Sequence, residues 1–220
     1  MKVMFAGPSG IGKTTLAEGL SVAKDIVYLS GSVSDLIPET KDISHKDMLG
    51  RDSKDLYMED YKILNLRKKL FQDKDDFVSD RSFLDLAAYF YYKQAGKIPA
   101  CEIEQFIELC KMCLNKYCTH LIYLPLNMFQ IREWLTEENG KRVTSNYFQV
   151  LISGIMSLVL DAWGAEPTKT WSYLGGLFKN TSLQWGAQEY LISSPYGQTK
   201  VIEISELDIN LRNKLIDQFL

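Results

Sequence analysis

The sequence predicts a three-layer α/β fold, in which a five-stranded parallel sheet is covered on both faces by helices. Two observations lead to this prediction. Five short apolar runs alternate with helical patterns along the 220 residues, as parallel strands and their crossover helices do. A glycine-rich stretch joins the first apolar run to the first helical pattern, a usual place for a ligand-binding turn in such folds.

Strands are predicted where short apolar runs are bounded by polar residues. The first run is too short for anything but a buried strand, and five runs share this character, at residues 2–6, 26–29, 77–79, 120–125 and 201–204. Helices are predicted where apolar residues recur at three- and four-residue intervals, at residues 14–23, 54–71, 83–94, 103–117, 144–163 and 206–219. Because ligands of parallel sheets bind beyond the carboxyl ends of the strands, polar residues directly after a strand are the candidates for function.

Length and composition indicate a single globular domain over residues 1–220. Hydrophobic residues make up 46% of the chain and charged residues 24%, which is ordinary for a globular protein with one substantial core. The net charge of −3 argues against a broad nucleic-acid-binding surface. No leader precedes the first strand and no apolar run reaches membrane-spanning length, so we expect a cytoplasmic protein with no membrane partner.

The four cysteines of the chain raise the question of a metal site. A Cys-x-x-Cys pair at positions 110 and 113 is followed by Cys118 and His120, but the second pair lacks a recognised ligand spacing. Cys110 and Cys113 fall instead into the apolar stripe of the predicted helix. We therefore predict reduced thiols in a hydrophobic core rather than metal ligands.

Residues 7–14 read GPSGIGKT and match the phosphate-binding loop pattern G-x-x-x-x-G-K-[ST] at every fixed position. Glycines let backbone N–H groups turn inward around a phosphate, and the helix that follows presents its positive N-terminal end. The pattern therefore predicts a site for a nucleoside triphosphate. Its predicted binding residues are Gly7, Ser9, Gly10, Ile11, Gly12, Lys13, Thr14 and Thr15.

Two side chains of this loop have predicted roles in phosphate chemistry. Lys13 can reach the β- and γ-phosphates of ATP, and the Thr14 hydroxyl can bind Mg²⁺. ATP and Mg²⁺ are therefore the expected cofactors, Thr14 is a candidate metal ligand, and Lys13 is a candidate catalytic residue.

A second polar motif follows the third predicted strand, where the sequence reads SDRSFLDLAAY from residue 79. Asp80 can contact the Mg²⁺ shell or take a proton from an attacking hydroxyl. Arg81 can hold an acceptor phosphate, or the negative charge of the transition state, through two hydrogen bonds. The alternative is an aspartate that caps the next helix beside a solvated arginine. The phosphate loop favours the functional interpretation, with both residues in catalysis and acceptor binding and Asp80 as a metal ligand.

Residues 132–146 are predicted to form a mobile lid. Arg132, Lys141 and Arg142 surround a turn between a short helical pattern and a long one. Phosphoryl transfer uses such cationic loops to cover the γ-phosphate and exclude water. We therefore expect Arg132 and Lys141 to contact ATP and Arg142 to act in catalysis. The alternative is an exposed, charged connection between two helices.

The three motifs resemble, in order and spacing, those of the P-loop nucleoside and nucleotide kinases. The third motif reads NGKRVTSNYFQVLISGIMSLVL from residue 139, and the chain end, TKVIEISELDINLRNKLIDQFL, resembles the last strand and helix of that family. The nicotinamide-riboside-kinase-like branch is the most similar, whereas deoxynucleoside and thymidylate kinases are more distant. The resemblance covers residues 1–163 and 200–220. It implies a five-stranded parallel sheet, a mobile lid over ATP and an acid–arginine pair for the acceptor, at Asp80 and Arg81.

Two segments depart from the family pattern. Residues 164–199 are an aromatic-rich insertion where relatives run more directly into the last strand. This insertion either completes the core or builds an acceptor pocket, and the pocket is slightly favoured. Residues 30–52 are polar and rich in loop-forming residues, and Arg51 within them is a candidate for gripping an acceptor phosphate.

The sequence thus predicts an enzyme, an ATP- and Mg²⁺-dependent kinase whose acceptor is a nucleoside or a (deoxy)nucleoside monophosphate. Arg81 and Arg51 incline the prediction slightly toward a monophosphate. One alternative is a kinase that phosphorylates a hydroxyl on a modified base or an end of DNA, which shares all three motifs. Another is a non-kinase P-loop NTPase or nucleotide-binding module, in which Asp80 and Arg81 have no role. The base, the sugar and the oligomeric state, a homodimer included, stay open.

Overall fold

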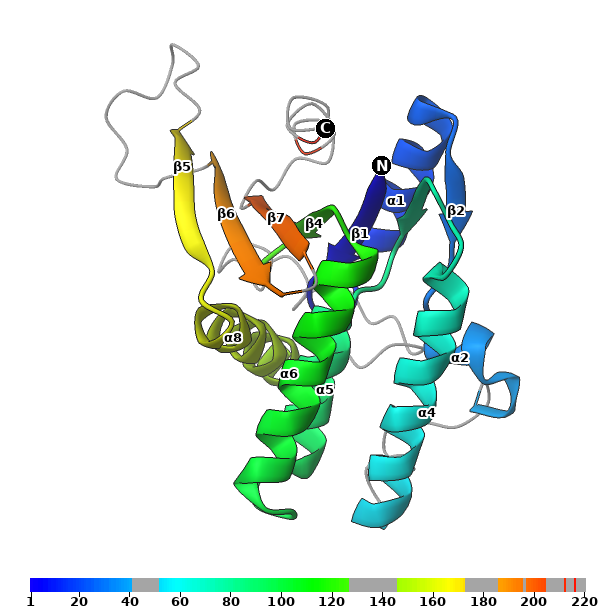
Figure 1. The fold of residues 1–220 in the computed structure, drawn as a ribbon, viewed down its shortest axis with the longest axis vertical. Coiled ribbons are helices and arrows are strands. Elements are labelled where there is room, and N and C mark those ends of the chain that lie inside the picture. Colours follow the sequence, from blue (N-terminus) through cyan, green and yellow to red (C-terminus); the bar gives the residue numbers. More distant parts are fainter. Residues whose placement is uncertain are drawn as a thin grey trace.

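The computed structural model describes residues 1–40, 52–126, 146–172, 186–195 and 197–204, together with Arg212 and Ile216. Figure 1 shows the elements that they form. In chain order these are β1 (Lys2–Ala6), α1 (Lys13–Lys24), β2 (Val27–Leu29), α2 (Val33–Leu36), the 3₁₀ helix η1 (Pro38–Thr40), α4 (Ser53–Phe71), β3 (Phe77–Ser79), α5 (Phe83–Gln94), α6 (Ala100–Tyr117), β4 (His120–Tyr123), α8 (Asn146–Ala162), β5 (Glu166–Ser172), β6 (Gly186–Ser194) and β7 (Gly197–Ile204).

The sheet has the strand order β2-β3-β1-β4-β7-β6-β5. The first five of these strands are parallel to one another and correspond to the five predicted strands. The α/β class and the parallel arrangement are therefore confirmed. Strands β6 and β5 extend the sheet in the antiparallel sense beyond β7, so the sheet of the described residues has two strands more than predicted.

The two additional strands come from the segment 164–199. Strand β6 turns directly back into β7, with Ser194 opposite Gly197, and β5 lies at the edge of the sheet. Pro167 stands in β5 at an irregularity of the register, which is where an edge strand tolerates a proline. An edge strand with few apolar residues carries little of the signal that identifies a buried strand. Residues 173–185 of this segment lie outside the described residues.

Strand β1 packs against helices on both of its faces. Met4 and Ala6 belong to the core cluster that includes residues of α4, α5, α6 and α8, whereas Val3 and Phe5 belong to the cluster that includes residues of α1. Because successive side chains of a strand point to opposite faces of the sheet, this alternation builds the predicted three layers. In Figure 1 the long helices α4, α5 and α6 continue beyond the end of the sheet.

Helices α1, α4, α5, α6 and α8 agree closely with the predicted ranges. Helix α2 and the 3₁₀ helix η1 were not predicted, and most of the helix predicted at 206–219 lies outside the described residues. Helix α5 begins at a capping box, in which the Ser82 side chain accepts from the backbone of Asp85 and the Asp85 side chain accepts from the backbone of Ser82. Such a reciprocal cap satisfies two N–H groups at a helix start. Among the described residues, no helix combines the length and apolar character needed to cross a lipid bilayer.

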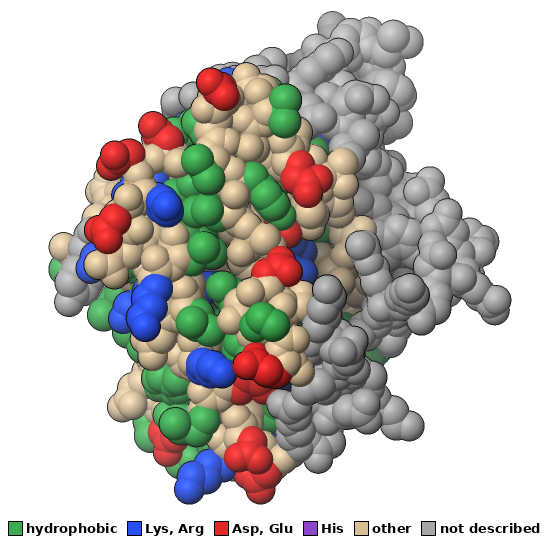
Figure 2. Space-filling view, turned by 90° about the vertical axis from the view of Figure 1, so that its right-hand side faces the viewer, with side chains coloured by type: hydrophobic (Ala, Val, Ile, Leu, Met, Phe, Trp, Pro, Cys, Tyr) green, Lys and Arg blue, Asp and Glu red, His purple; other side chains and the backbone are tan. Residues whose placement is uncertain are grey.

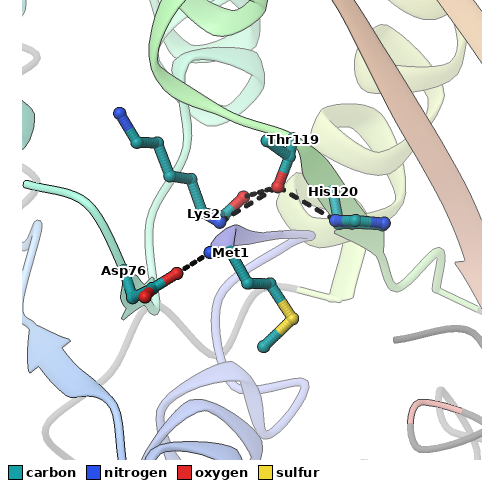
Figure 3. A network of polar contacts seen from close by, with 5 residues as sticks. All are labelled: Met1, Lys2, Asp76, Thr119 and His120. Atoms are coloured by element: carbon teal, nitrogen blue, oxygen red, sulfur yellow. Dashed lines mark hydrogen bonds and ion pairs between the residues drawn. The ribbon is translucent and has the colours of Figure 1, made fainter.

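A polar network ties together the amino ends of β1, β3 and β4 (Figure 3). The backbone N–H of Lys2 donates to Thr119 Oγ1, at 3.0 Å, and Thr119 Oγ1 also lies 3.0 Å from His120 Nδ1. The amino group of Met1 forms an ion pair with Asp76, next to β3. Burial, followed by the charge of Lys200, lowers the pKa of His120. This network fixes the strand ends at the edge of the sheet opposite the phosphate loop.

Helix α6 contains Cys110 and Cys113, the Cys-x-x-Cys pair of the sequence. Cys110 is fully buried, Cys113 is 5% exposed, and both belong to the large core cluster. Burial raises the pKa values of both thiols. The predicted placement of this pair in an apolar stripe is confirmed, and both thiols are free.

Replacing Phe106 with alanine should lower the free energy of unfolding by about 3–5 kcal/mol. Phe106 is fully buried, and its ring stacks on that of Phe90 with 3.8 Å between the centroids. Chemical denaturation measures the loss. Val22→Ala is the control, because this side chain is 83% exposed and its truncation should change stability by less than about 0.5 kcal/mol. Equal effects of the two changes would contradict the packing described here.

Candidate active site

The phosphate-loop motif lies between β1 and α1, the context that its pattern requires. Gly7, Gly10 and Gly12 have φ angles of +149°, +84° and +89°, which glycine adopts far more readily than other residues. A Cβ atom on Gly7 would lie 2.5 Å from the carbonyl oxygen of Leu124. The loop therefore fits closely against the end of β4 only because its first residue has no side chain.

The side chain of Lys13 lies against the loop. Its ammonium Nζ donates to the carbonyl oxygens of Gly7, at 2.6 Å, and Pro8, at 2.7 Å. Lys13 is only 5% exposed, although it stands at the first position of α1. The positive charge is thus held at the mouth of the loop, where the helix N-terminus adds a partial positive charge of its own.

Asp80 links the phosphate loop to the end of the neighbouring strand β3. Its Oδ2 accepts a hydrogen bond from Thr14 Oγ1, at 2.8 Å, and its Oδ1 accepts one from the backbone N–H of Gly31, at 3.2 Å. Burial and the charge of Asp80 raise the pKa of Tyr28 to about 12. The carboxylate is 4% exposed, so its orientation is fixed by contacts with residues after β1, β2 and β3.

Thr14 and Asp80 together suit a magnesium ion. Mg²⁺ prefers oxygen ligands and usually takes one or two of them from the protein, with the rest from phosphates and water. The hydroxyl and the carboxylate are hydrogen-bonded partners, so one ion can contact both. In the part of the chain that the structure describes, no group of three or more His, Cys, Asp or Glu residues is arranged to hold a metal ion.

Arg81 follows Asp80 and is positioned by a close backbone contact. Its backbone N–H donates to Ser79 Oγ, at 3.3 Å. A Cβ atom on Gly31 would lie 2.8 Å from Arg81 Cβ, closer than real Cβ atoms approach. The absence of a side chain at Gly31 therefore lets the Asp80–Arg81 segment lie directly against the end of β2.

A cavity of about 290 Å³ opens beside Arg81, near the lower end of the usual size for small-molecule pockets. It lies between α2, α4 and α5. Its polar and aromatic lining residues are Ser32, Ser34, Asp60, Arg67, Arg81, Asp85, Tyr89, Tyr92 and Lys93, and its aliphatic ones are Val33, Ile63 and Leu86. Two aspartates, three cations and two phenols thus surround a space that opens beside Arg81.

Two of the three cations of this pocket are engaged with other groups of the protein. Arg67 is 3% exposed and donates to the carbonyl oxygens of Ser82, at 2.5 Å, and Gly31, at 3.0 Å. Burial lowers the pKa of Arg67 to about 10. Lys93 forms an ion pair with Asp60. For the side chain of Arg81, the third cation, the described residues provide neither a hydrogen-bond acceptor nor an ion-pair partner.

Each of the two pocket aspartates has one carboxylate oxygen without a hydrogen-bond partner among the described residues, Asp85 Oδ1 and Asp60 Oδ2. Asp85 uses its other oxygen, Oδ2, to cap α5, and Asp60 uses Oδ1 for Lys93. Both residues are 1% exposed. Burial raises the pKa of Asp60, whereas the charge of Lys93 acts against this shift. Both residues line the cavity, with these two oxygens covered by the surrounding protein.

Comparison with solved structures relates this architecture to nucleoside kinases. The deoxyadenosine kinase from M. mycoides, solved with bound dATP, superimposes with a TM-score of 0.58 at 13% sequence identity, over 100% of this chain and 98% of that one. The YorR protein from Bacillus subtilis, solved in complex with phosphorylated GDP, gives a TM-score of 0.42 at 16% identity, over 73% of this chain and 79% of that one. No protein-family model matches the sequence. No curated protein matches it either.

The chain shares its fold with this deoxyadenosine kinase. The superposition on the deoxyadenosine kinase spans both chains almost completely, so the two additional strands do not prevent the overall match. At 13% identity the likeness establishes the fold, and the chemistry has to be argued from the side chains themselves.

The structure brings together only part of the predicted site. The loop residues 7–14, Asp80 and Arg81 lie at one edge of the sheet, and Thr15 is exposed on the first turn of α1. Arg51 and the predicted lid residues Arg132, Lys141 and Arg142 lie outside the described residues. The described residues of the insertion 164–199 extend the sheet and do not line the cavity of about 290 Å³.

Sequence reasoning missed several residues that the fold brings to the site. Asp60 and Arg67 stand on the same helical stripe as the buried Leu56, Ile63 and Phe71 in the helix predicted at 54–71, so charges inside an apolar stripe were a signal that could have found them. Lys93, near the end of the helix predicted at 83–94, carried no such signal. Gln149 in α8 donates to the Ser9 carbonyl oxygen, and Arg212 donates to that of Ile11. Asp85 could have been identified from the sequence, because Ser82-x-x-Asp85 before an apolar run has the pattern of a capping box.

Replacing Gly31 with alanine should lower the turnover of phosphoryl transfer by roughly 10- to 100-fold. The new Cβ would meet Arg81 Cβ at 2.8 Å, so the Asp80–Arg81 segment would have to move. Steady-state kinetics measure the loss, and circular dichroism verifies the fold. Gly19→Ala is the matched control, because a Cβ there meets nothing within 4 Å. Full activity of the Gly31→Ala protein would show that this close approach is not needed.

Proposed function

We propose that this protein is a Mg²⁺-dependent kinase that transfers the γ-phosphate of ATP to the hydroxyl of a nucleoside. The observation that carries the proposal is the contact between Thr14 of the phosphate loop and Asp80, whose neighbour in the sequence, Arg81, lines the cavity. This contact joins a donor site for a triphosphate to a cavity for a second molecule. The fold shared with a deoxyadenosine kinase supports the same conclusion.

In the proposed reaction, the loop amides and Lys13 hold the β- and γ-phosphates of ATP. Lys13 exchanges its contacts with the Gly7 and Pro8 carbonyl oxygens for the phosphate oxygens. Bound Mg²⁺, held by Thr14 and Asp80, neutralises charge on the phosphates. The lid residues Arg132, Lys141 and Arg142 keep their proposed roles in covering ATP and stabilising the transferred group.

Asp80 and Arg81 act on the acceptor side. The Asp80 carboxylate accepts the proton of the attacking hydroxyl as the new P–O bond forms and the bond between the γ-phosphorus and the β–γ bridging oxygen breaks. Arg81 neutralises the charge of the group in transfer. ADP leaves with the electron pair of the broken bond, and the acceptor becomes a nucleoside monophosphate.

The charges of the pocket favour a nucleoside over a nucleoside monophosphate. Arg67 and Lys93 are engaged by the protein itself, and two aspartates, Asp60 and Asp85, line the same cavity. An acceptor phosphate would add negative charge beside these two carboxylates, whereas an uncharged nucleoside adds none. This proposal departs from the slight preference for a monophosphate that Arg81 and Arg51 suggested in the sequence.

The DNA kinase alternative has less support. Binding of a nucleic-acid strand needs a cationic groove, whereas the face in Figure 2 intersperses acidic, basic and apolar side chains over its described part. A nucleotide-binding module without transferase activity would leave the buried Asp80 carboxylate and Arg81 beside a pocket with nothing to act on. A cytoplasmic location, where ATP and nucleosides are both available, completes the proposal.

Incubation of the purified protein with labelled ATP and a panel of nucleosides, nucleoside monophosphates and short DNA tests the proposal directly. We expect label in nucleoside monophosphates formed from free nucleosides. Label only in diphosphates or only in DNA would replace the proposed acceptor, and ATP hydrolysis without any labelled acceptor would contradict the kinase assignment.

Replacing Lys13 with alanine should reduce transfer by about 100-fold or more, because the ammonium stabilises charge that develops on the phosphates. Turnover is measured with the best acceptor of the panel. Thermal unfolding of the protein without nucleotide checks that the fold is kept. A folded Lys13→Ala protein with unchanged turnover would refute the proposed role of the loop.

Replacing Asp80 with asparagine distinguishes the two kinds of acceptor. Asparagine keeps the shape and can still accept from Gly31 and contact Thr14, but it cannot accept the proton of a hydroxyl. With a nucleoside acceptor, kcat should fall by about 10²- to 10⁴-fold at every Mg²⁺ concentration. An anionic phosphate acceptor needs no such base, so recovery of activity at high Mg²⁺ would indicate a monophosphate.

A further inference from the structure

The phosphate loop is held by side chains on its carbonyl side. Gln149 Nε2, from α8, donates to the carbonyl oxygen of Ser9, at 3.0 Å, and Arg212 Nη1 donates to that of Ile11, at 2.9 Å. Lys13 donates to the two preceding carbonyl oxygens of the loop. Side chains that are 140 and 201 residues away in sequence thus determine where the loop carbonyl groups point.

The direction of a carbonyl group also fixes the direction of an N–H group. A trans peptide is planar, so its C=O and its N–H point in opposite directions. The bond from Gln149 to the Ser9 carbonyl therefore directs the N–H of Gly10 away from α8. In the same manner, the bond from Arg212 to the Ile11 carbonyl directs the N–H of Gly12 away from Arg212. Amide groups of this loop are what a phosphate-binding loop uses to hold its ligand.

Lys13 cannot hold the carbonyl groups of the loop once a nucleotide is bound. Its ammonium contacts carbonyl oxygens, and it leaves them when it turns to a phosphate. Glycines at positions 10 and 12 also leave these peptides free to rotate, because glycine adopts conformations of either sign of φ. Gln149 and Arg212 hold the two peptides whether or not Lys13 has moved.

The stability of the fold does not by itself account for glutamine at position 149. The side chain is 5% exposed, and its Oε1 has no hydrogen-bond partner among the described residues. A buried polar atom without a partner is unfavourable, and a methionine fills a similar volume without it. Glutamine can donate a hydrogen bond to the carbonyl oxygen of Ser9, whereas methionine cannot.

We propose that Gln149 and Arg212 are positioning residues for the triphosphate: they hold the Ser9 and Ile11 carbonyl groups so that the amides of Gly10 and Gly12 face the phosphates. This inference rests on the proposed function only insofar as the loop binds a nucleoside triphosphate. It does not depend on which acceptor the protein uses.

Calorimetric titration with MgATP and with inorganic triphosphate plus Mg²⁺ tests the proposal on four variants. Gln149→Met should weaken the binding of both ligands equally, by about fivefold, the value of one neutral hydrogen bond. Arg212→Met should weaken both by about tenfold or more, because a charged donor is lost. Arg212→Lys keeps a positively charged donor and should regain a large part of the affinity.

Thr199→Val is the matched control. Thr199 Oγ1 also donates from a buried side chain to a backbone carbonyl, that of Cys118, at 3.1 Å, but this bond lies at the other edge of the sheet. The change should lower the melting temperature and leave both binding constants as in the unaltered protein. An equal loss of affinity in Thr199→Val would show that general destabilisation, rather than the loop, explains the effect.

The remaining outcomes also decide the question. Unchanged affinity in Gln149→Met and Arg212→Met would overturn the proposal, as would a loss seen with ATP but not with triphosphate, which would place Gln149 against the nucleoside. If Gln149→Met does not fold, the contrast between Arg212→Met and Arg212→Lys decides. Should the unaltered protein bind ATP but phosphorylate no acceptor, the proposed kinase activity fails and the positioning role is still tested by these titrations.

Discussion

The hydrogen bond between Thr14 and Asp80, at 2.8 Å, connects the two halves of the candidate site. Thr14 ends the phosphate-loop motif in the first turn of α1, whereas Asp80 directly follows the neighbouring strand β3. The bond therefore requires β1 and β3 to be parallel neighbours in the register that pairs Met4 with Ser79. The same strand end places the next residue, Arg81, beside the cavity.

A buried arginine supports the acceptor side of this arrangement. Arg67 reaches from α4 to the carbonyl oxygens of Gly31 and Ser82, so that the segments after β2 and β3 are held by one guanidinium. The planar donor fork of arginine suits such a role, since its hydrogen bonds leave in fixed directions. Gly31 takes part twice, because its N–H also donates to Asp80. Backbone atoms after the ends of two strands are thus linked through one aspartate and one arginine.

Much of the fold could be predicted because parallel strands and their helices leave strong local signals. The strands at residues 2–6 and 77–79 and the helix at 83–94 match the observed bounds, since continuous apolar runs and helical spacing of apolar residues identify them without tertiary information. Strands β5 and β6 gave no such signal. Strand β5 lies at an edge and reads EPTKTWS, so its pairing with β6 depends on a neighbour that is absent from its own sequence.

The sequence by itself determined the phosphate loop, because glycine conformations and a following helix are local properties that eight residues can specify. It also placed Asp80 and Arg81 at a strand end. Only the tertiary structure decided which distant side chains meet them. Gln149 and Arg212 lie 140 and 201 residues from the carbonyl groups that they hold, and the Asp60–Lys93 pair joins two helices. The apolar stripe of a helix indicates which charged residues are buried, but the packing of the helices on the sheet decides which partners these residues meet.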